Sequence, residues 1–313
     1  MSKLPIYFAP LQGYTEDAYR RAHCKVVGGI ERYLTPFVRT IHGEVRSKDL
    51  RDIDHTHNES VPVLPQLIAG DEDEMRRLTE VILKEGYKEV NINMGCPFPL
   101  QTRHGHGAGI LPHPDKVEEI LKAMTEFPEV CFSIKMRLGL ADADEWRALM
   151  PMFNDARLSH ITLHPRIASQ QYSGTADMDA FRAFAQECRV PLIYNGDITT
   201  PADIERLHND LPTLAGVMIG RGLLARPTLA CEYLNGTELP ESERLSILLR
   251  IHDELHNHYS RIIPGDSAQL QKLRTYWDYL EPTIGHKAWK KIHKAINWKK
   301  YNEAVSEIAT TFQ

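Results

Sequence analysis

The chain has 313 residues, of which 42% are hydrophobic and 25% charged, a composition typical of a folded protein rather than a disordered one. No apolar run approaches the roughly 20 residues that a membrane helix needs, and the start "MSKLPIYFAP" lacks the layout of a signal peptide. The five cysteines are scattered and form no CxxC pair, which argues against a disulfide framework or a metal site and indicates reduced thiols in the cytoplasm. The net charge of −5 gives no hint of a nucleic-acid partner.

Short apolar runs alternate with helical patterns along the first three quarters of the chain. The runs predict eight strands, at residues 5–9, 31–38, 62–68, 88–93, 130–136, 160–164, 190–194 and 215–219. Apolar spacing predicts helices between some of them, at 72–85, at 115–126 and after Thr200-Pro201. Because alternating strands and helices favour parallel pairing, we expect the α/β class and a TIM (β/α)8 barrel, with an open doubly wound sheet as the alternative.

The last quarter of the chain differs in pattern and in charge. A polar, turn-rich stretch at 234–243 indicates a linker, so we expect a barrel domain over 1–236 and a small all-helical domain over 243–313. Within it, "HKAWKKIHKAINWKKY" at 286–301 carries six lysines and no acid. This stretch is either a solvated amphipathic helix with its apolar side chains toward the core, or a helix whose lysines contact RNA phosphates. The apolar side chains in question are Trp289, Ile292 and Ile296.

Unusual residues fall at the ends of the predicted strands, where a TIM barrel forms its active site. Gly196, Gly220 and Gly222 allow backbone N–H groups to approach an anion and Arg221 adds positive charge, which indicates a phosphate site. Lys135 would stabilise an anionic ring, while Gln66 and Asn93 suit the edge of a heterocyclic amide. Cys96 follows a strand in a tight turn and could be a nucleophile or a proton donor. Each of these features alone also has a plain structural explanation as a turn, rim or packing residue.

Several motifs together resemble one known family. The run "VNINMGCPFPLQTRHGHGA", residues 90–108, resembles the signature of the tRNA-dihydrouridine synthases, in which N-x-G-C-P precedes a Gly-Ala pair at fixed spacing. The opening "APLQGYTEDAYR" is similar to the first-strand motif of that family. The segments "KMRLG", "HPRIASQQYSG", "NGDI" and "GRGLLARP" match later motifs in order. The resemblance covers residues 5 to about 230 well and the C-terminal helices loosely.

The resemblance implies an FMN-containing TIM barrel whose helical domain helps to hold tRNA, and which reduces the C5–C6 double bond of particular uridines with NADPH as reductant. Cys96 would be the catalytic acid, and Asn93, Arg166 and Tyr172 would lie near the target uracil. Phosphate contacts would come from Lys290, Lys291 and Lys294. The residues implied to contact FMN are Pro10, Leu11, Gln12, Gln66, Lys135, His164, Asn195, Gly196, Asp197, Gly220 and Arg221. We expect a cytoplasmic monomer that binds tRNA but no DNA, membrane or metal.

The chain departs from the family pattern in places that bear on tRNA contact. Phe98-Pro99 follows Gly-Cys-Pro where Ser-Lys is common, and Thr35-Pro36 stands where Thr-Glu is frequent. Leu11 replaces a usual Met, and Pro165 a usual Gly. Two alternatives to a tRNA-uridine reductase are a small-molecule pyrimidine flavoenzyme of the dihydroorotate dehydrogenase type and a non-catalytic RNA-binding barrel. Which uridine would be reduced does not follow from the sequence.

Overall fold

A parallel sheet forms the centre of the molecule. The structure is a computed structural model that describes residues 3–311. Within these residues nine strands pair in the order β5-β2-β1-β11-β10-β9-β8-β7-β6, and every pair between them is parallel. The strands are β1 Ile6–Phe8, β2 Arg32–Leu34, β5 Val63–Leu64, β6 Gln66–Leu67, β7 Glu89–Met94, β8 Cys131–Gly139, β9 Leu158–Ile167, β10 Leu192–Asn195 and β11 Gly216–Ile219.

The first and last strands in this order, β5 and β6, are consecutive in the chain and are separated only by Pro65. The predicted strand 62–68 is split there into β5, which pairs with β2, and β6, which pairs with β7. Proline has no N–H to donate, but the Pro65 carbonyl still accepts from the Asn91 N–H at 2.8 Å. The sheet therefore closes into a barrel, which confirms the TIM-barrel prediction over the open sheet. The predicted strand 31–38 is also shorter in the structure, because β2 ends before Pro36.

Side chains alternate between the two faces of the barrel wall. Along β1, Ile6 and Phe8 belong to the large outer core between strands and helices. Tyr7, and Ala9 just after the strand, face inward. The inner cluster is small and apolar, and consists of Ala9, Leu34, Leu64, Ile193 and Met218. This cluster fills one part of the barrel interior, and the buried polar side chains of Gln66, Asn91 and Ser133 fill another.

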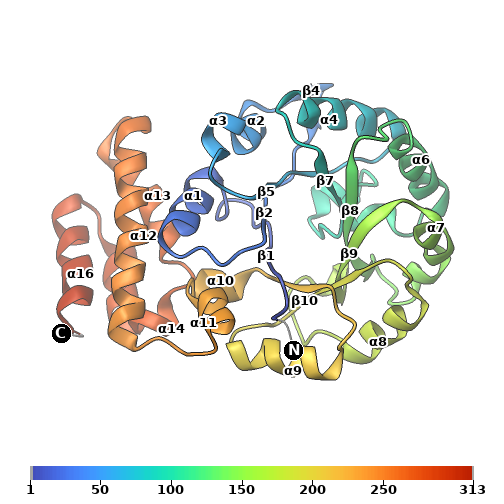
Figure 1. Ribbon diagram of the computed structural model, residues 1–313. Helices are drawn as coiled ribbons and strands as arrows, with labels where there is room; N and C mark the ends of the chain where they lie inside the picture. The colour runs from blue at the N-terminus through green and yellow to red at the C-terminus, as the bar shows by residue number, and fades with distance from the viewer. Residues whose placement is uncertain (1–2, 312–313) are drawn as a thin grey trace.

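Helices surround the barrel (Figure 1). The predicted helices over 72–85, 115–126 and after Thr200 are α4, α6 and α9. Asp71 starts α4 by accepting from the Glu74 N–H, and Thr200 starts α9 with a capping box before Pro201. A short hairpin, β3 Thr40–Ile41 with β4 Glu44–Val45, was not predicted. The helices here are α1 Asp17–Val26, α2 Ser47–Ile53, α3 His55–Asn58, α4 Glu72–Lys84, α5 Pro99–Thr102, α6 Pro114–Met124, α7 Met150–Asp155, α8 Met178–Glu187, α9 Pro201–Asp210, α10 Arg221–Ala225 and α11 Leu229–Asn235, with 3-10 helices η1 Gly107–Ile110, η2 Glu145–Ala148 and η3 Ala168–Gln170.

The C-terminal region is helical and stands beside α1 at one side of the barrel (Figure 1). Trp277 and Tyr301 are fully buried in it, and the Trp277 indole donates to the Tyr301 hydroxyl at 2.9 Å. Among residues 3–311, no helix is both long and apolar enough to cross a bilayer. The C-terminal helices are α12 Glu241–Ile262, α13 Asp266–Tyr276, α14 Glu281–Ile284, α15 His286–Lys294 and α16 Trp298–Thr311.

The sequence suggested that the basic stretch 286–301 forms one helix, but the structure divides it between two. It comprises α15 and the start of α16, separated by an extended residue, Ala295, and two more residues. Because the helix ends at Lys294, Ile296 leaves the apolar face and is 77% exposed, so its predicted place in the core is wrong. Ile292 is fully buried as expected. The exposed lysines therefore lie on two short helices joined by a bend.

Candidate active site

A cavity of about 780 Å³ opens at the C-terminal ends of the barrel strands. Strand ends and the loops after them form most of its wall, and residues 278–282 of the C-terminal region form one side. The predicted barrel residues that line it are Pro10, Leu11, Gln12, Gln66, Asn93, Cys96, Lys135, His164, Tyr172, Asn195, Gly196, Asp197, Gly220 and Arg221. Arg166 differs from these, because its side chain is 1% exposed and lies behind the wall. The lysines of α15 lie outside the cavity.

A chain of hydrogen-bonded amides runs from the floor of the cavity into the barrel interior. Asn93 donates to Gln66 at 2.8 Å, Gln66 donates to Asn91 at 2.7 Å, and Asn91 donates to the Ser133 hydroxyl at 2.8 Å. Gln66 and Asn91 are fully buried, so these partners replace the water that the amides would otherwise require. The chain fixes the orientation of each amide and leaves Gln66 and Asn93 at the cavity surface.

Asn93 also shapes the turn that carries Cys96. Its Oδ1 accepts from the N–H groups of Gly95 at 3.0 Å and Cys96 at 2.8 Å, which holds the thiol-bearing residue at the end of β7. Gly107 packs against Cys96 so closely that a Cβ at Gly107 would lie 2.8 Å from the Cys96 Cβ. Burial raises the pKa of the Cys96 thiol, against the opposing effects of the Phe98 N–H and nearby cations. Cys96 therefore keeps its proton at neutral pH.

Positive charge is concentrated at the centre of the cavity. Burial, with Arg137 nearby, lowers the pKa of Lys135 to about 7. Burial and the same two cations hold the pKa of His164 far below its usual range, so this imidazole is neutral. No sequence pattern indicates a role for Arg137, although it lies two residues after Lys135 on β8. Its guanidinium stands 5.7 Å from the centre of the exposed Tyr172 ring at the cavity mouth.

Arg166 holds several parts of the site from behind. Its guanidinium donates to Asp197 at 2.6 Å, to the Gly174 carbonyl at 2.7 Å and to His164 Nε2 at 2.9 Å. Since His164 Nε2 accepts, its proton must be on Nδ1. Burial raises the pKa of Asp197, but its hydrogen bond from Arg166 and the charge of Arg221 outweigh that effect and keep the carboxyl ionised. Asp197 has φ of +45°, so this ion pair fixes an unusual backbone conformation beside Gly196.

The loops after β9, β10 and β11 approach one another too closely for larger residues. A Cβ at Gly196 would lie 3.0 Å from the Ala176 Cβ, and one at Gly222 only 2.1 Å from the Ile198 carbonyl oxygen. Gly220 precedes α10, whose first N–H groups have no partner within the helix. Arg221 lies at the same edge, so the structure brings the residues of the predicted anion site together, and their binding of an anion stays a prediction.

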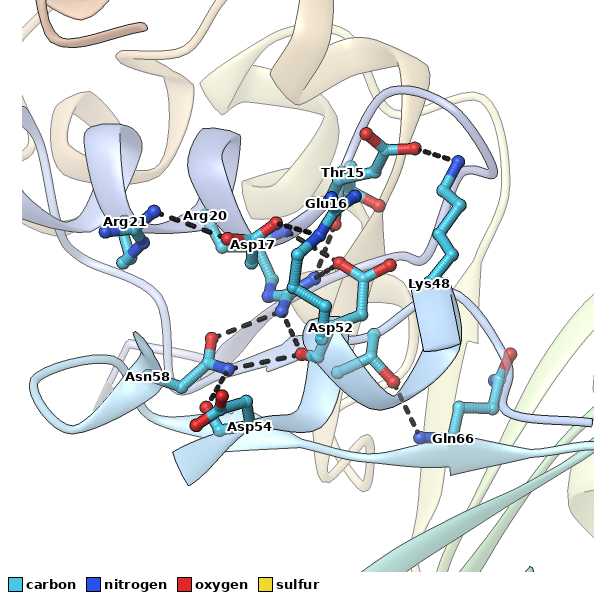
Figure 2. A network of polar contacts seen from close by, with 12 residues as sticks. Thr15, Glu16, Asp17, Arg20, Arg21, Lys48, Asp52, Asp54, Asn58 and Gln66 are labelled. Atoms are coloured by element: carbon cyan, nitrogen blue, oxygen red, sulfur yellow. Dashed lines mark hydrogen bonds and ion pairs between the residues drawn. The ribbon is translucent and has the colours of Figure 1, made fainter. Parts of the chain in front are cut away.

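A buried polar network supports the loop 11–15, which lines the cavity after β1, beside the loop after β11 (Figure 2). Arg20 donates to the Thr15 carbonyl at 2.7 Å and contacts Asp52 at 3.4 Å, and both charged side chains are 1% exposed. Thr15 in turn accepts from the Leu11 N–H at 2.8 Å. Burial raises the pKa of Asp52 to about 6, although Arg20 and the Asp17 N–H act against that rise. The loop that lines the cavity thus rests on a fixed ion pair.

The C-terminal region contributes directly to the site, which the sequence analysis did not predict. The Tyr14 hydroxyl donates to Asp278 at 3.1 Å, and the other oxygen of Asp278 contacts His293 Nε2 of α15 at 2.9 Å. The neighbouring Tyr279 packs edge-on against Tyr14, with ring centres 5.0 Å apart. Tyr14 falls within the motif "APLQGYTEDAYR", which could have marked it, whereas no sequence signal marks residues 278–282. The helix with the lysines is therefore connected to the cavity through Asp278.

Comparison with known proteins identifies the family. A family model described as Dihydrouridine synthase (Dus) matches residues 7–313. The chain belongs to the dihydrouridine synthase family. It is accordingly an oxidoreductase that forms dihydrouridine, which decides against both the dihydroorotate dehydrogenase type and the non-catalytic barrel.

Individual relatives agree with this assignment. The chain is 29% identical over 297 residues to tRNA-dihydrouridine synthase B of Yersinia pestis and 27% identical over 297 residues to that of Escherichia coli (strain K12). Each alignment covers 92% of this chain and 90% of the relative. Among solved structures, a 2-naphthoyl-CoA reductase complex has a TM-score of 0.57 at 11% identity, covering 76% of this chain and 50% of that one. Morphinone reductase in complex with tetrahydroNAD has a TM-score of 0.51 at 12% identity, covering 75% and 87%. These two show a shared fold.

Proposed function

We propose that this dihydrouridine synthase acts on tRNA, binds FMN in the cavity, takes its reducing equivalents from NADPH and uses Cys96 as the proton donor. The observation that carries the proposal is the convergence of Cys96, Lys135 and the 196 and 220–222 loops on one cavity in a chain of this family. The relatives named as tRNA-dihydrouridine synthases support tRNA as the substrate.

The cavity fits FMN in volume and in chemistry. About 780 Å³ lies within the range of cofactor sites, and the glycine loops with Arg221 suit the phosphate. The fixed amides of Gln66 and Asn195 suit the polar edge of the ring, and Asn195 is held by its own bond to the Met218 carbonyl at 2.7 Å. Reduced FMN, when bound, would supply a hydride to C6 of the uracil. Lys135 would offset negative charge on the ring, since a nearby anion favours its protonated form.

Cys96 has the protonation state that a catalytic acid needs. Hydride addition at uracil C6 leaves negative charge at C5 and O4, so C5 must then receive a proton. The raised pKa of the Cys96 thiol keeps that proton available at neutral pH, and the Asn93 hydrogen bonds hold the residue at the cavity edge. A carboxylate would be ionised there and unable to donate. Asn93 contributes by fixing the Cys96 turn, and it also lines the cavity.

The substrate must place one base in this cavity, because an enzyme that modifies a base takes it out of its stack. Tyr172 is 48% exposed at the mouth of the cavity, and the Arg221 guanidinium lies 4.3 Å from the centre of its ring. The exposed ring can therefore stack on an entering nucleotide. Lys290, Lys291 and Lys294 are exposed on α15 and would contact phosphates of the same tRNA. The protein would act as a monomer in the cytoplasm.

Dihydrouridine mapping tests this function directly. We expect tRNA from cells that lack the gene to lose dihydrouridine at particular positions, and the purified protein with NADPH to restore it there. Equal dihydrouridine in both tRNA pools, together with no activity of the purified protein on unmodified tRNA, would contradict the proposal.

A further inference from the structure

An ion pair connects the loop after Cys96 to the start of α4. His106 Nε2 lies 2.6 Å from Glu74 Oε2, and the two side chains are only 20% and 23% exposed. The other Glu74 oxygen accepts from the Thr40 hydroxyl of β3 at 2.6 Å, and Glu74 Oε2 also accepts from the Gly70 N–H at 2.9 Å. Glu74 therefore joins the β3 hairpin, the turn after β6 and the loop that follows Cys96.

The two residues after His106 transmit this restraint to Cys96. His106 is followed directly by Gly107, the residue that packs on the Cys96 Cβ. The next residue, Ala108, donates its N–H to the Cys96 carbonyl at 3.1 Å. The ring of His106 lies over Gly70, where a Cβ would be only 3.0 Å from it. The ring is thus enclosed between two segments and has little freedom to move.

Electrostatics support a charged pair rather than a neutral contact. The Glu74 hydrogen bond outweighs burial and raises the pKa of His106, with Asp71 at the start of α4 adding to the rise. Burial raises the pKa of Glu74, but the bonds from His106, Thr40 and the Gly70 N–H outweigh it and lower that pKa to about 2. A hydrogen bond between two charged, partly buried groups is stronger than a neutral one.

We propose that Glu74 and His106 clamp the loop that carries Cys96, which makes His106 a positioning residue for protonation of uracil C5. The catalytic part of this inference rests on the proposed role of Cys96. The mechanical part does not, because it concerns only where the clamp holds the thiol. Loss of the clamp frees residues 97–108 from α4 and exposes Cys96 to solvent.

Alkylation of Cys96 tests the mechanical part in the full-length protein. The rate for each of the five cysteines is measured with iodoacetamide and peptide mass spectrometry in His106→Ala, Glu74→Gln and the double variant. We expect the Cys96 rate to rise about tenfold in each single variant, the loss expected for a charged hydrogen bond, and no further in the double variant. The other four cysteines should not change. A Cys96 rate within twofold of the parent in both single variants would overturn the clamp.

Two further variants separate the clamp from general destabilisation. His57→Ala removes a more exposed His–Asp contact of 3.7 Å on α3, which supplies no residue to the cavity, and should leave Cys96 alkylation unchanged. His106→Gln keeps an N–H donor toward the Glu74 carboxylate but loses the imidazolium charge, so its Cys96 should be alkylated at a rate between those of the parent and of His106→Ala. Alkylation as fast as in His106→Ala would overturn the proposal.

Single-turnover reduction of tRNA uridine tests the catalytic part. In His106→Ala we expect the rate constant to fall about tenfold while tRNA affinity stays within twofold, because the clamp acts on the proton donor and not on the RNA surface. An unchanged rate constant, where Cys96→Ala is slow, would overturn the positioning role. A normal rate in Cys96→Ala would instead refute the proposed acid and leave the alkylation result standing.

Discussion

Replacing Arg166 decides between the two roles this residue could have, contact with the uracil or support of the cavity wall. Its side chain is 1% exposed and donates to Asp197, His164 and the carbonyls of Ser173 and Gly174, so Arg166→Met would leave four acceptors without their donor. Each lost bond costs about 1–3 kcal/mol, and Asp197 belongs at the low end because it is 38% exposed. The total is about 4–10 kcal/mol, or roughly 6–15 °C in melting temperature at an unfolding entropy of about 2.1 cal/mol/K per residue.

The assay compares melting temperature, bound flavin and uridine reduction in Arg166→Met with those in a surface control. Arg182→Met removes an exposed pair with Asp179 on α8, where only a few tenths of a kcal/mol are expected. If Arg166 supports the wall, Arg166→Met loses flavin and thermal stability together. A variant that keeps its melting temperature and its flavin but fails to reduce uridine would refute this reasoning and place Arg166 at the substrate.

Three further predictions follow from the geometry of the site. Gly222→Ala should lower the yield of folded protein, because its Cβ would lie 2.1 Å from the Ile198 carbonyl oxygen, whereas Gly220→Ala should lower it less, because its Cβ would lie 3.2 Å from Leu11 Cδ1 and 3.3 Å from the Ala9 Cβ. Replacing Lys290, Lys291 and Lys294 by Ala should weaken tRNA binding and flatten its salt dependence by about two charges rather than three, since Lys291 already pairs with Glu307. FMN affinity should fall as pH rises from 6.5 to 8.5, because Lys135 loses its proton near pH 7 in the free protein, and titrations of Lys135→Gln should show a flatter profile.

The parts of the fold that depend on local patterns could be predicted from the sequence. Apolar runs and helical spacing located the eight strand regions and α4, α6 and α9, because these elements bury one continuous face. The strand break at Pro65 has a local cause that the sequence contains, but its consequence, closure of the sheet between β2 and β7, depends on both neighbours. A continued helical period predicts Ile296 in the core, but α15 ends at Lys294 and the chain bends there, so Ile296 is exposed.

The site was predicted unevenly for a physical reason. Residues at strand ends were found because parallel strands bring their ends to one rim, as for Asn93, Cys96 and Lys135. Contacts between distant segments have no such periodicity. Asp278 reaches Tyr14 across 264 positions, and Glu74 reaches His106 across 32, and neither pairing follows from spacing. Their positions required the tertiary structure.

Single-turnover oxidation of the reduced flavin by unmodified tRNA, in Cys96→Ala and Cys96→Ser, tests the central claim most directly. Both variants should keep FMN, bind tRNA and accept electrons from NADPH at a near-normal rate, because Cys96 is proposed only to protonate C5. Oxidation by tRNA should slow by about 10²–10⁴-fold in Cys96→Ala, the range for loss of a positioned acid, and nearly as much in Cys96→Ser. A normal rate of oxidation in both variants would contradict the account and remove Cys96 from the mechanism.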